Sequence, residues 1–253
     1  MCMVEFRCLI ISFISICLFS FSQASSPHDE FVEVVSSAKQ AVVIIETTRP
    51  RNAKQQTFSV LGETAGFFKD ELKEISSDSQ VSRGTGFIID SHIGSKVSIL
   101  TAAHVVKKAS TVNVLFSDGS RGKADIVWSN KKNDIALLEV EISGELFQPL
   151  LLSKKKVIEG QQVLSISVLH DLSVSSSLGI VSGVDVFLRS RKAVPLIQTD
   201  AAATPSSSGG ALLDSKGRVV GLISSVYTRS GNFSGIAFAI PATVIEDLIA
   251  SRG

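Results

Sequence analysis

Cysteine is scarce in this sequence and is confined to its beginning. The 253 residues include three cysteines, Cys2, Cys8 and Cys17, and all of them lie in an apolar segment that has the features of a targeting signal. Without that segment the chain has no cysteine, so no disulfide is expected and the hydrophobic core alone must hold the fold together. This excludes the disulfide-rich class of secreted enzymes and suits a bacterial periplasm at least as well.

An excess of positive charge is missing too. Lysine and arginine together number 25, and aspartate and glutamate number 24, whereas proteins that bind nucleic acid need a basic stripe. The sequence has no paired cysteines of the zinc type, no GxxxxGKS/T phosphate loop and no HExxH motif. Its four histidines lie far apart. We therefore predict no nucleic-acid partner, no metal site and no cofactor.

The N-terminus carries an apolar run that is short. Arg7 precedes the run LIISFISICLFSF, and the small-residue pattern Ser22-Gln23-Ala24 follows it. A membrane-spanning helix needs about 20 apolar residues, so this run fits the core of a signal peptide better. We predict a signal peptide over residues 1–24, export to the periplasm or beyond, and no stable membrane span after cleavage. An uncleaved signal anchor is the alternative, because Glu5 weakens the positive charge before the run.

The rest of the chain favours short strands. Helical spacing over 31–38 is followed by a β-branched run over 41–45 and then by a polar stretch, about 48–82, that is long for a connection. From Gly84 onward, short apolar runs alternate with turn signals such as Asp118-Gly119. The pattern predicts an all-β protein with two halves, about 40–143 and 149–240, and a final helix over 241–251. Periodicity alone does not choose between two antiparallel barrels and a sandwich.

Three polar residues stand in apolar surroundings. His104 lies in ILTAAHVV, Asp134 opens NDIALLEV, and Ser208 precedes two glycines in SSSGGALL. A serine hydroxyl becomes a nucleophile when a base takes its proton, and the base needs an acceptor that fixes its tautomer and stabilises its cation. Each residue alone would more often be structural. Together, in the order His, Asp, Ser at three strand ends, they predict a catalytic triad.

These strings, with IQTDAA, GRVVGLISS and GIAFAIP, resemble the protease domain of the HtrA/Deg family of trypsin-like serine proteases, from about Val32 to the C-terminus. The resemblance implies two six-stranded antiparallel β-barrels of the chymotrypsin type with the active site between them. It also implies that the 48–82 stretch reaches between subunits, so a trimer is expected. The family's PDZ domain is not expected, since the sequence stops directly after the predicted final helix.

The resemblance also assigns roles around the triad. It implies that the backbone N–H groups of Ser206 and Ser208 form the oxyanion hole. The segment Ser224-Ser225-Val226 is expected to pair with the substrate backbone as an added strand. Ala202 stands where trypsin carries the acid that binds lysine or arginine, so cleavage after a small or medium apolar residue is expected instead.

Two departures from the family concern the oxyanion hole. The family usually has glycine where this chain has Ser206, and a non-glycine residue with the positive φ of that position costs about 1–2 kcal/mol. If the peptide flips to relieve this strain, one donor is lost, which in a well-studied protease lowers the rate roughly 10²–10³-fold. In addition, Ser167-Val168-Leu169 replaces the family's Gly-x-Pro before its activation-sensing loop.

Two functions therefore stay open from the sequence. The first is an exported serine endopeptidase that acts on unfolded or exposed polypeptides. The second is a catalytically impaired relative that binds polypeptides as a chaperone or regulatory subunit. A serine hydrolase of a different fold is remote, because the order of the three residues differs and no GxSxG motif is present.

Overall fold

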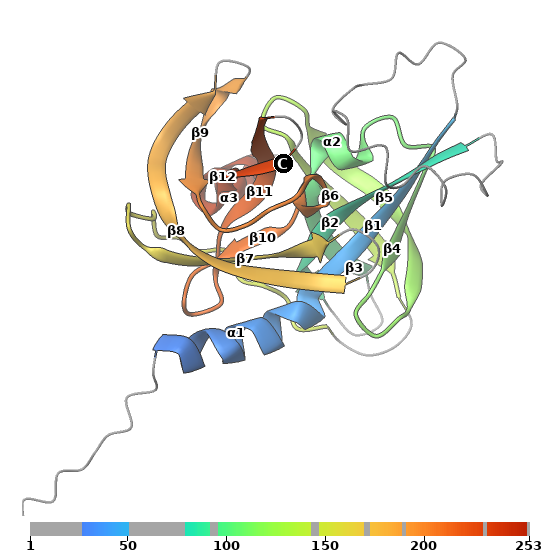
Figure 1. Ribbon diagram of the computed structural model, residues 1–253. Helices are drawn as coiled ribbons and strands as arrows, with labels where there is room; N and C mark the ends of the chain where they lie inside the picture. The colour runs from blue at the N-terminus through green and yellow to red at the C-terminus, as the bar shows by residue number, and fades with distance from the viewer. Residues whose placement is uncertain are drawn as a thin grey trace, which may run out of the picture.

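The computed structural model describes residues 27–50, 79–91, 96–142, 147–169, 173–188, 191–229 and 232–251. The predicted signal peptide, residues 1–24, and most of the predicted intersubunit stretch, residues 51–78, lie outside the described residues. Two barrels stand side by side, with one helix running along their outside (Figure 1).

The first barrel is closed and antiparallel. Its strands follow one another around the barrel in the order β1-β2-β3-β6-β5-β4. The strands are β1 (Val42–Pro50), β2 (Ser79–Ser91), β3 (Lys96–Ala102), β4 (Thr111–Leu115), β5 (Arg121–Asn130) and β6 (Ile135–Glu141). A short helix, α2 (Ala103–Val106), follows β3 directly.

The second barrel has the same number of strands, in the order β10-β11-β12-β9-β8-β7. Its strands are β7 (Gln162–Leu169), β8 (Ser173–Leu188), β9 (Arg191–Thr199), β10 (Ala211–Leu213), β11 (Val219–Arg229) and β12 (Asn232–Pro241). A 3₁₀ turn, η3 (Pro205–Ser207), precedes β10. The predicted pair of six-stranded barrels is therefore confirmed, and both sheets close instead of stacking as a sandwich.

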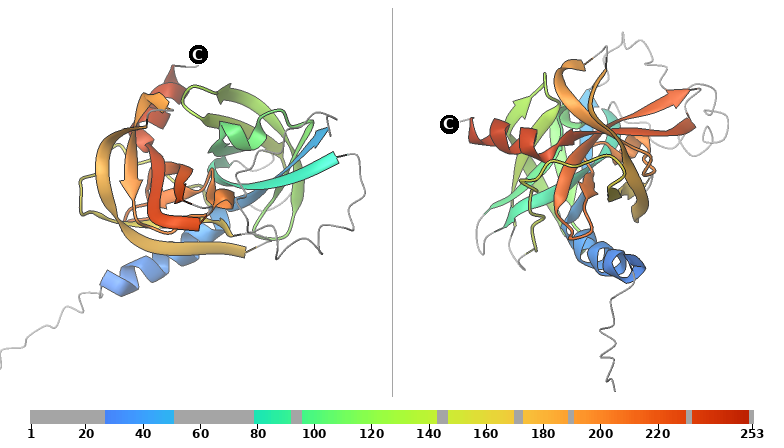
Figure 2. Two further views of the ribbon diagram at one scale, coloured as in Figure 1. Left: turned by 45° about the horizontal axis from the view of Figure 1, so that its top comes forward. Right: turned by 90° about the vertical axis from the view of Figure 1, so that its left-hand side faces the viewer.

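Two longer helices flank the barrels. Helix α1 (Pro27–Ala41) buries Phe31, Val34 and Ala38, which are spaced at helical period, and it ends where the β-branched run of β1 begins. Helix α3 (Ala242–Ala250) starts after Pro241, which serves as its N-cap, and it packs on β11 and β12. The two views of Figure 2 show both helices outside the barrels. None of the described helices is long and apolar enough to cross a membrane.

Candidate active site

The pairing of β3 with β6 brings His104 and Asp134 together. These strands are antiparallel, and Ala102 at the end of β3 lies opposite Ile135 at the start of β6. Ala103 follows Ala102 and begins α2, whose second residue is His104. On the opposite strand, Asp134 directly precedes Ile135. A hydrogen bond of 3.1 Å from Ala103 N to the Asp134 carbonyl oxygen closes this end of the ladder.

The Asp134 carboxylate holds both the ring and the backbone of His104. Nδ1 of the ring lies 3.0 Å from Oδ1 and 2.9 Å from Oδ2, and the His104 backbone N–H donates to Oδ1 at 2.9 Å. The Asp134 side chain is 6% exposed and that of His104 is 42% exposed. Since Nδ1 faces a carboxylate acceptor, this contact favours the tautomer with the proton on Nδ1, which leaves the lone pair of Nε2 free. Asp134 has φ +62°, a left-handed conformation that aspartate tolerates better than most residues.

A residue of the second barrel completes the environment of this carboxylate. The hydroxyl of Ser224 donates to Oδ2 of Asp134 at 2.6 Å, across 90 residues of sequence. The register of β11 against β12 shifts between Ile223 and Ser225, so Ser224 sits at an irregularity. Such bulges redirect side chains out of the regular alternation. Ser224, which the sequence placed in a substrate-binding segment, thus contacts Asp134 through its side chain.

Two glycines allow the Ser208 loop to pack tightly. Gly209 has φ +89°, and a side chain there would clash with the carbonyl oxygen of Thr85 and the hydroxyl of Thr101. A Cβ on Gly210 would lie 2.7 Å from the Cβ of Ser167. The loop that carries Ser208 therefore lies directly against the first barrel at Gly209 and against β7 of the second barrel at Gly210, and neither contact leaves room for a larger residue.

Backbone hydrogen bonds fix this loop from both barrels. Thr85 N donates to the Ser208 carbonyl oxygen at 3.0 Å, and Gly209 N donates to the Ile223 carbonyl oxygen at 2.7 Å. The strand β11 that receives this second bond also presents Ser224 to Asp134. The structure thus brings the loop of Ser208 to the junction where the His104–Asp134 pair lies. Among the described residues, no hydrogen bond joins the Ser208 hydroxyl to His104.

The turn before Ser208 has its own hydrogen-bond pattern. Ser207 N donates to the Thr204 carbonyl oxygen at 2.9 Å, and Ser208 N donates to the Pro205 carbonyl oxygen at 3.4 Å. These three-residue steps are those of a 3₁₀ turn. Of the non-glycine residues in the described ranges, only Lys108, Asp134 and Asp185 have positive φ. Ser206 therefore lies outside the left-handed region.

Hydroxyl groups hold Ser206 in this turn. Its side chain donates to the Val168 carbonyl oxygen at 3.0 Å and lies 2.8 Å from the Thr204 hydroxyl. Its carbonyl oxygen accepts a 2.7 Å hydrogen bond from the Thr85 hydroxyl, which in turn accepts from Val168 N at 3.0 Å. The serine in place of glycine is therefore a member of a network that links β2, β7 and η3.

The residue after Ala202 belongs to a small apolar cluster. Ala203, Ile223 and Ala237 form a separate buried cluster with Val226 packed against it. Ala202 itself is tied down by its backbone, because its N–H donates to the Ser177 hydroxyl at 3.1 Å and its carbonyl oxygen accepts from Ser165 at 2.8 Å. These neighbours carry no charge.

The nearest acidic residue in sequence, Asp200, is directed elsewhere. Its Oδ1 accepts a 2.7 Å hydrogen bond from Ile180 N on β8. Asp200, which precedes Ala202 by two residues, therefore binds strand β8 through its carboxylate.

Beyond Ile223, strand β11 has one strand neighbour among the described elements. Residues 219–222 pair with β10, whereas Ser225 and Val226 pair only with Phe238 and Ala237 of β12. The edge of β11 that faces the Ser208 loop is therefore not used by another described strand from this point on.

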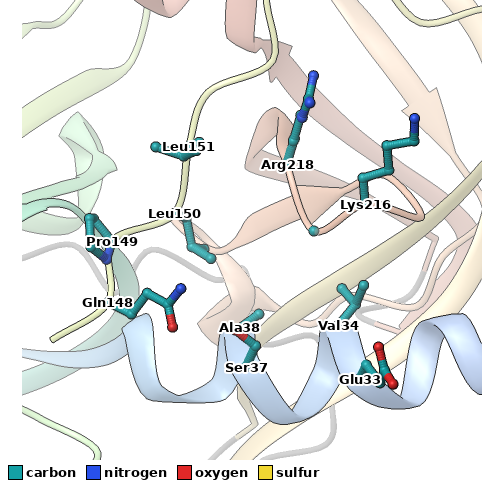
Figure 3. A pocket seen from close by; sticks show the side chains of 11 residues that line it. Glu33, Val34, Ser37, Ala38, Gln148, Pro149, Leu150, Leu151, Lys216 and Arg218 are labelled. Carbon is teal, nitrogen blue, oxygen red and sulfur yellow. The ribbon is translucent and has the colours of Figure 1, made fainter.

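Two hollows of the surface lie away from these residues. One of about 320 Å³ is lined by α1, by 148–151 and by the turn 216–218, as Figure 3 shows with Lys216 and Arg218 above Glu33. The other, of about 770 Å³, lies between the same connection and α3. Neither is lined by His104, Asp134 or Ser208, so both belong to the packing of the helices against the segment that joins the barrels.

Sequence reasoning missed two contributors to this site. The contact of Ser224 with Asp134 depends on a register shift in β11, which no pattern in SSV indicates. Thr85 is separated from Ser206 by 121 residues, and its role depends on how the two barrels meet. In the sequence Thr85 is simply one residue of the apolar strand GTGFIID.

Comparison with known proteins identifies the family. The sequence matches the trypsin-like peptidase domain over residues 84–222, which is more than half of the chain. The chain belongs to this family. A probable periplasmic serine endoprotease, DegP-like, of Marinomonas sp. (strain MWYL1) is 34% identical over 236 residues, which cover 87% of this chain and 49% of the relative. A protein of the same description from Halomonas elongata is 34% identical over 247 residues, 91% of this chain and 51% of the relative.

Solved structures agree with this assignment. The HtrA-type protease AlgW with a tripeptide has a TM-score of 0.69 and 25% identity, covering 87% of this chain and 62% of that one. The same protease with a decapeptide has a TM-score of 0.67 at 23% identity, covering 87% and 66%, and supports the fold. The resemblance of this trypsin-like peptidase domain to HtrA/Deg proteases is confirmed. The chain spans about half the length of the curated relatives it matches.

Proposed function

We propose that this trypsin-like peptidase domain is a serine endopeptidase with His104, Asp134 and Ser208 as its catalytic residues. Ser208 Oγ attacks the carbonyl carbon of a peptide bond while Nε2 of His104 takes its proton and then gives it to the leaving amine. Water repeats the same steps on the acyl-enzyme and releases the second product. The observation that carries this proposal is the clamp on His104, whose ring and backbone both bind an Asp134 carboxylate that is itself bound by Ser224.

The substrate in this proposal is an extended stretch of unfolded or exposed polypeptide. At Ser225 and Val226 one edge of β11 is not paired with any described strand, which suits the addition of a substrate strand. Ile223, which forms an apolar cluster with Ala203 and Ala237, directly precedes Ser224, and this cluster carries no charge. A small or medium apolar side chain before the cleaved bond fits this environment better than lysine or arginine.

The resting conformation in this proposal has an unformed oxyanion hole. In this conformation the Ser208 N–H donates to the Pro205 carbonyl oxygen, so it is not available to an oxyanion. The group beside it is a carbonyl oxygen, which accepts hydrogen bonds and cannot donate one. A developing oxyanion needs donors already aimed at it. Activity then requires the Pro205–Ser206 peptide to turn, so that the N–H groups of Ser206 and Ser208 face the substrate together.

Export and assembly complete the proposal. The curated relatives are named periplasmic, which supports export directed by the predicted signal peptide. A homotrimer formed through the 48–82 stretch stays part of the proposal, although residues 51–78 lie outside the described part of the chain.

A non-catalytic, polypeptide-binding protein is the second candidate. The observation that favours it is the same Ser208 N to Pro205 hydrogen bond, held by the hydroxyl network of Ser206. If the turn never opens, the barrels and the edge of β11 would still bind an extended chain. In this case the protein would bind polypeptides without cleaving them.

Digestion of unfolded casein separates the two candidates. The protein and its Ser208→Ala variant are each incubated with casein, and the products are sequenced by mass spectrometry. The endopeptidase predicts new termini after alanine, valine and similar residues with the protein and none with the variant. Equal casein binding by both proteins without any cleavage would support the second candidate instead.

A further inference from the structure

We propose that Arg49 is a positioning residue that holds α2, and through it His104, in the orientation that catalysis needs. This inference rests on the function proposed above. Arg49 lies near the end of β1, 55 positions before His104 in the sequence, and no motif marks it. Its importance follows from what its guanidinium group contacts.

The guanidinium group of Arg49 binds the C-terminal end of α2. Nη2 donates to the Val105 carbonyl oxygen at 2.9 Å and Nε donates to the Lys107 carbonyl oxygen at 3.0 Å. Nη1 donates to the Ser82 hydroxyl on the neighbouring strand at 3.3 Å. One side chain therefore joins β1, β2 and the segment that carries His104.

These carbonyl groups need a partner from outside the helix. The last carbonyl groups of any α-helix have no intrahelical donor, and α2 has four residues. Val106 O accepts from Ala109 N within the following turn, whereas Val105 O and Lys107 O accept from Arg49. Because the guanidinium is planar and presents its donors as a rigid fork, it fixes the direction of both carbonyl groups at once.

The backbone of β1 holds the rest of the same segment. Ser110 donates to the Thr48 carbonyl oxygen through both its N–H, at 2.8 Å, and its hydroxyl, at 2.9 Å. At the other end, Asp134 binds the N–H groups of Ala103 and His104. The segment 103–110 is thus clamped by Asp134 at its start and by the end of β1 at its finish.

Apolar packing alone would not set this orientation. Val105 and Val106 of α2 are buried and hold the helix against the barrel. The hydrophobic effect, however, is not directional. The His104 side chain is 42% exposed, so few neighbours restrict its ring. The direction of the His104 ring, and with it of Nε2, must then follow from the backbone of α2 and from Asp134.

Arg121 offers a matched control. It lies in the same barrel and its guanidinium pairs with Glu46 at 3.1 Å. Among the described residues, Arg121 makes no hydrogen bond or ion pair to 103–110. We compare Arg49→Met and Arg49→Lys with Arg121→Met. Hydrogen exchange of the backbone amides of 103–110 is measured in every protein, together with kcat and KM on an unfolded peptide and the folded fraction by circular dichroism.

In Arg49→Met, the amides of His104 and Ser110 should exchange about tenfold faster. Its kcat should fall roughly 10–100-fold, because small misplacements of a catalytic group have effects of this size, while KM changes little. Arg49→Lys, which can bind one carbonyl at a time, should lie between, and Arg121→Met should match the unaltered protein.

Unchanged exchange in Arg49→Met would overturn the inference, whatever happens to the rate. A fall in kcat shared by Arg121→Met would overturn it as well. If the unaltered protein cleaves nothing, the proposed function fails, but the exchange comparison still decides whether Arg49 holds the His104 segment.

Discussion

The backbone N–H of Ser208 donates to the carbonyl oxygen of Pro205, three residues earlier, at 3.4 Å. In the proposed mechanism this long hydrogen bond has a direct chemical consequence, because an oxyanion hole that uses the Ser208 N–H needs it free and directed at the substrate. Ser206, inside this turn, does not have a positive φ, and its hydroxyl holds the turn by binding the Val168 carbonyl oxygen. The residue that departs from the family is thus also the residue that stabilises the closed turn.

Replacement of Ser206 by glycine should raise basal activity. Ser206→Gly removes the hydroxyl that binds Val168 and Thr204, and it lowers the cost of a positive φ at this position. Since one oxyanion donor contributes roughly 10²–10³-fold to the rate in a well-studied protease, kcat/KM on an apolar peptide should rise by up to that factor. Ser215→Gly, in the turn before β11, is the control. Equal activities of all three proteins would show that Ser206 does not limit catalysis.

Loss of the Ser224 hydroxyl should lower kcat. Ser224→Ala leaves the buried Asp134 carboxylate without a 2.6 Å donor, and hydrogen bonds to charged groups contribute about 1.5–3 kcal/mol. We expect kcat to fall about ten- to hundredfold in steady-state kinetics, with KM nearly unchanged. Ser91, at the end of β2, is the matched control, because its buried hydroxyl has no partner among the described residues. A Ser91→Ala variant as impaired as Ser224→Ala would contradict the proposed role.

Removal of the Thr85 hydroxyl should destabilise the junction of the barrels. Thr85→Val leaves Val168 N and the Ser206 carbonyl oxygen without their common partner. Unsatisfied buried groups cost about 1–3 kcal/mol each, so the free energy of unfolding in a urea titration should fall by about that amount. Thr47→Val, which removes a single 3.3 Å hydrogen bond within the first barrel, should have a smaller effect. The reverse ranking would refute the role of Thr85 as a link.

Enlargement of Ala203 should change the preferred cleavage site. Ala203→Leu fills the apolar cluster with Ile223 and Ala237, so a peptide with valine before the scissile bond should lose about 10–100-fold in kcat/KM relative to one with alanine. A set of peptides that differ at this one position measures the ratio. Ala250→Leu, at the exposed end of α3, should leave the ratio unchanged, and an unaltered ratio in Ala203→Leu would place the specificity pocket elsewhere.

The sequence predicted the strands and the family because those depend on local signals, and the two barrels followed from the resemblance to the family. Apolar runs such as ILTA and IALLEV marked the strands, and the strings around His104, Asp134 and Ser208 carried the resemblance. The closure of each sheet did not follow from periodicity, because pairing between β1 and β4 joins segments about 65 residues apart.

The finer parts of the site depend on contacts between distant segments. The sequence showed that a serine at position 206 would be strained, because the family has a glycine with a positive φ there. Its partners Thr85 and Val168 come from different barrels, so the sequence could not show what would hold the alternative conformation. For the same reason the guanidinium group of Arg49 could not be assigned to α2.

Fluorophosphonate labelling tests most directly whether Ser208 is a nucleophile whose oxyanion hole is closed at rest. Intact mass is recorded over time for the unaltered protein, Ser208→Ala and Ser206→Gly. The account predicts slow labelling of the unaltered protein, none of Ser208→Ala, and faster labelling of Ser206→Gly. Labelling of Ser208→Ala, or no labelling of any of the three, would contradict it.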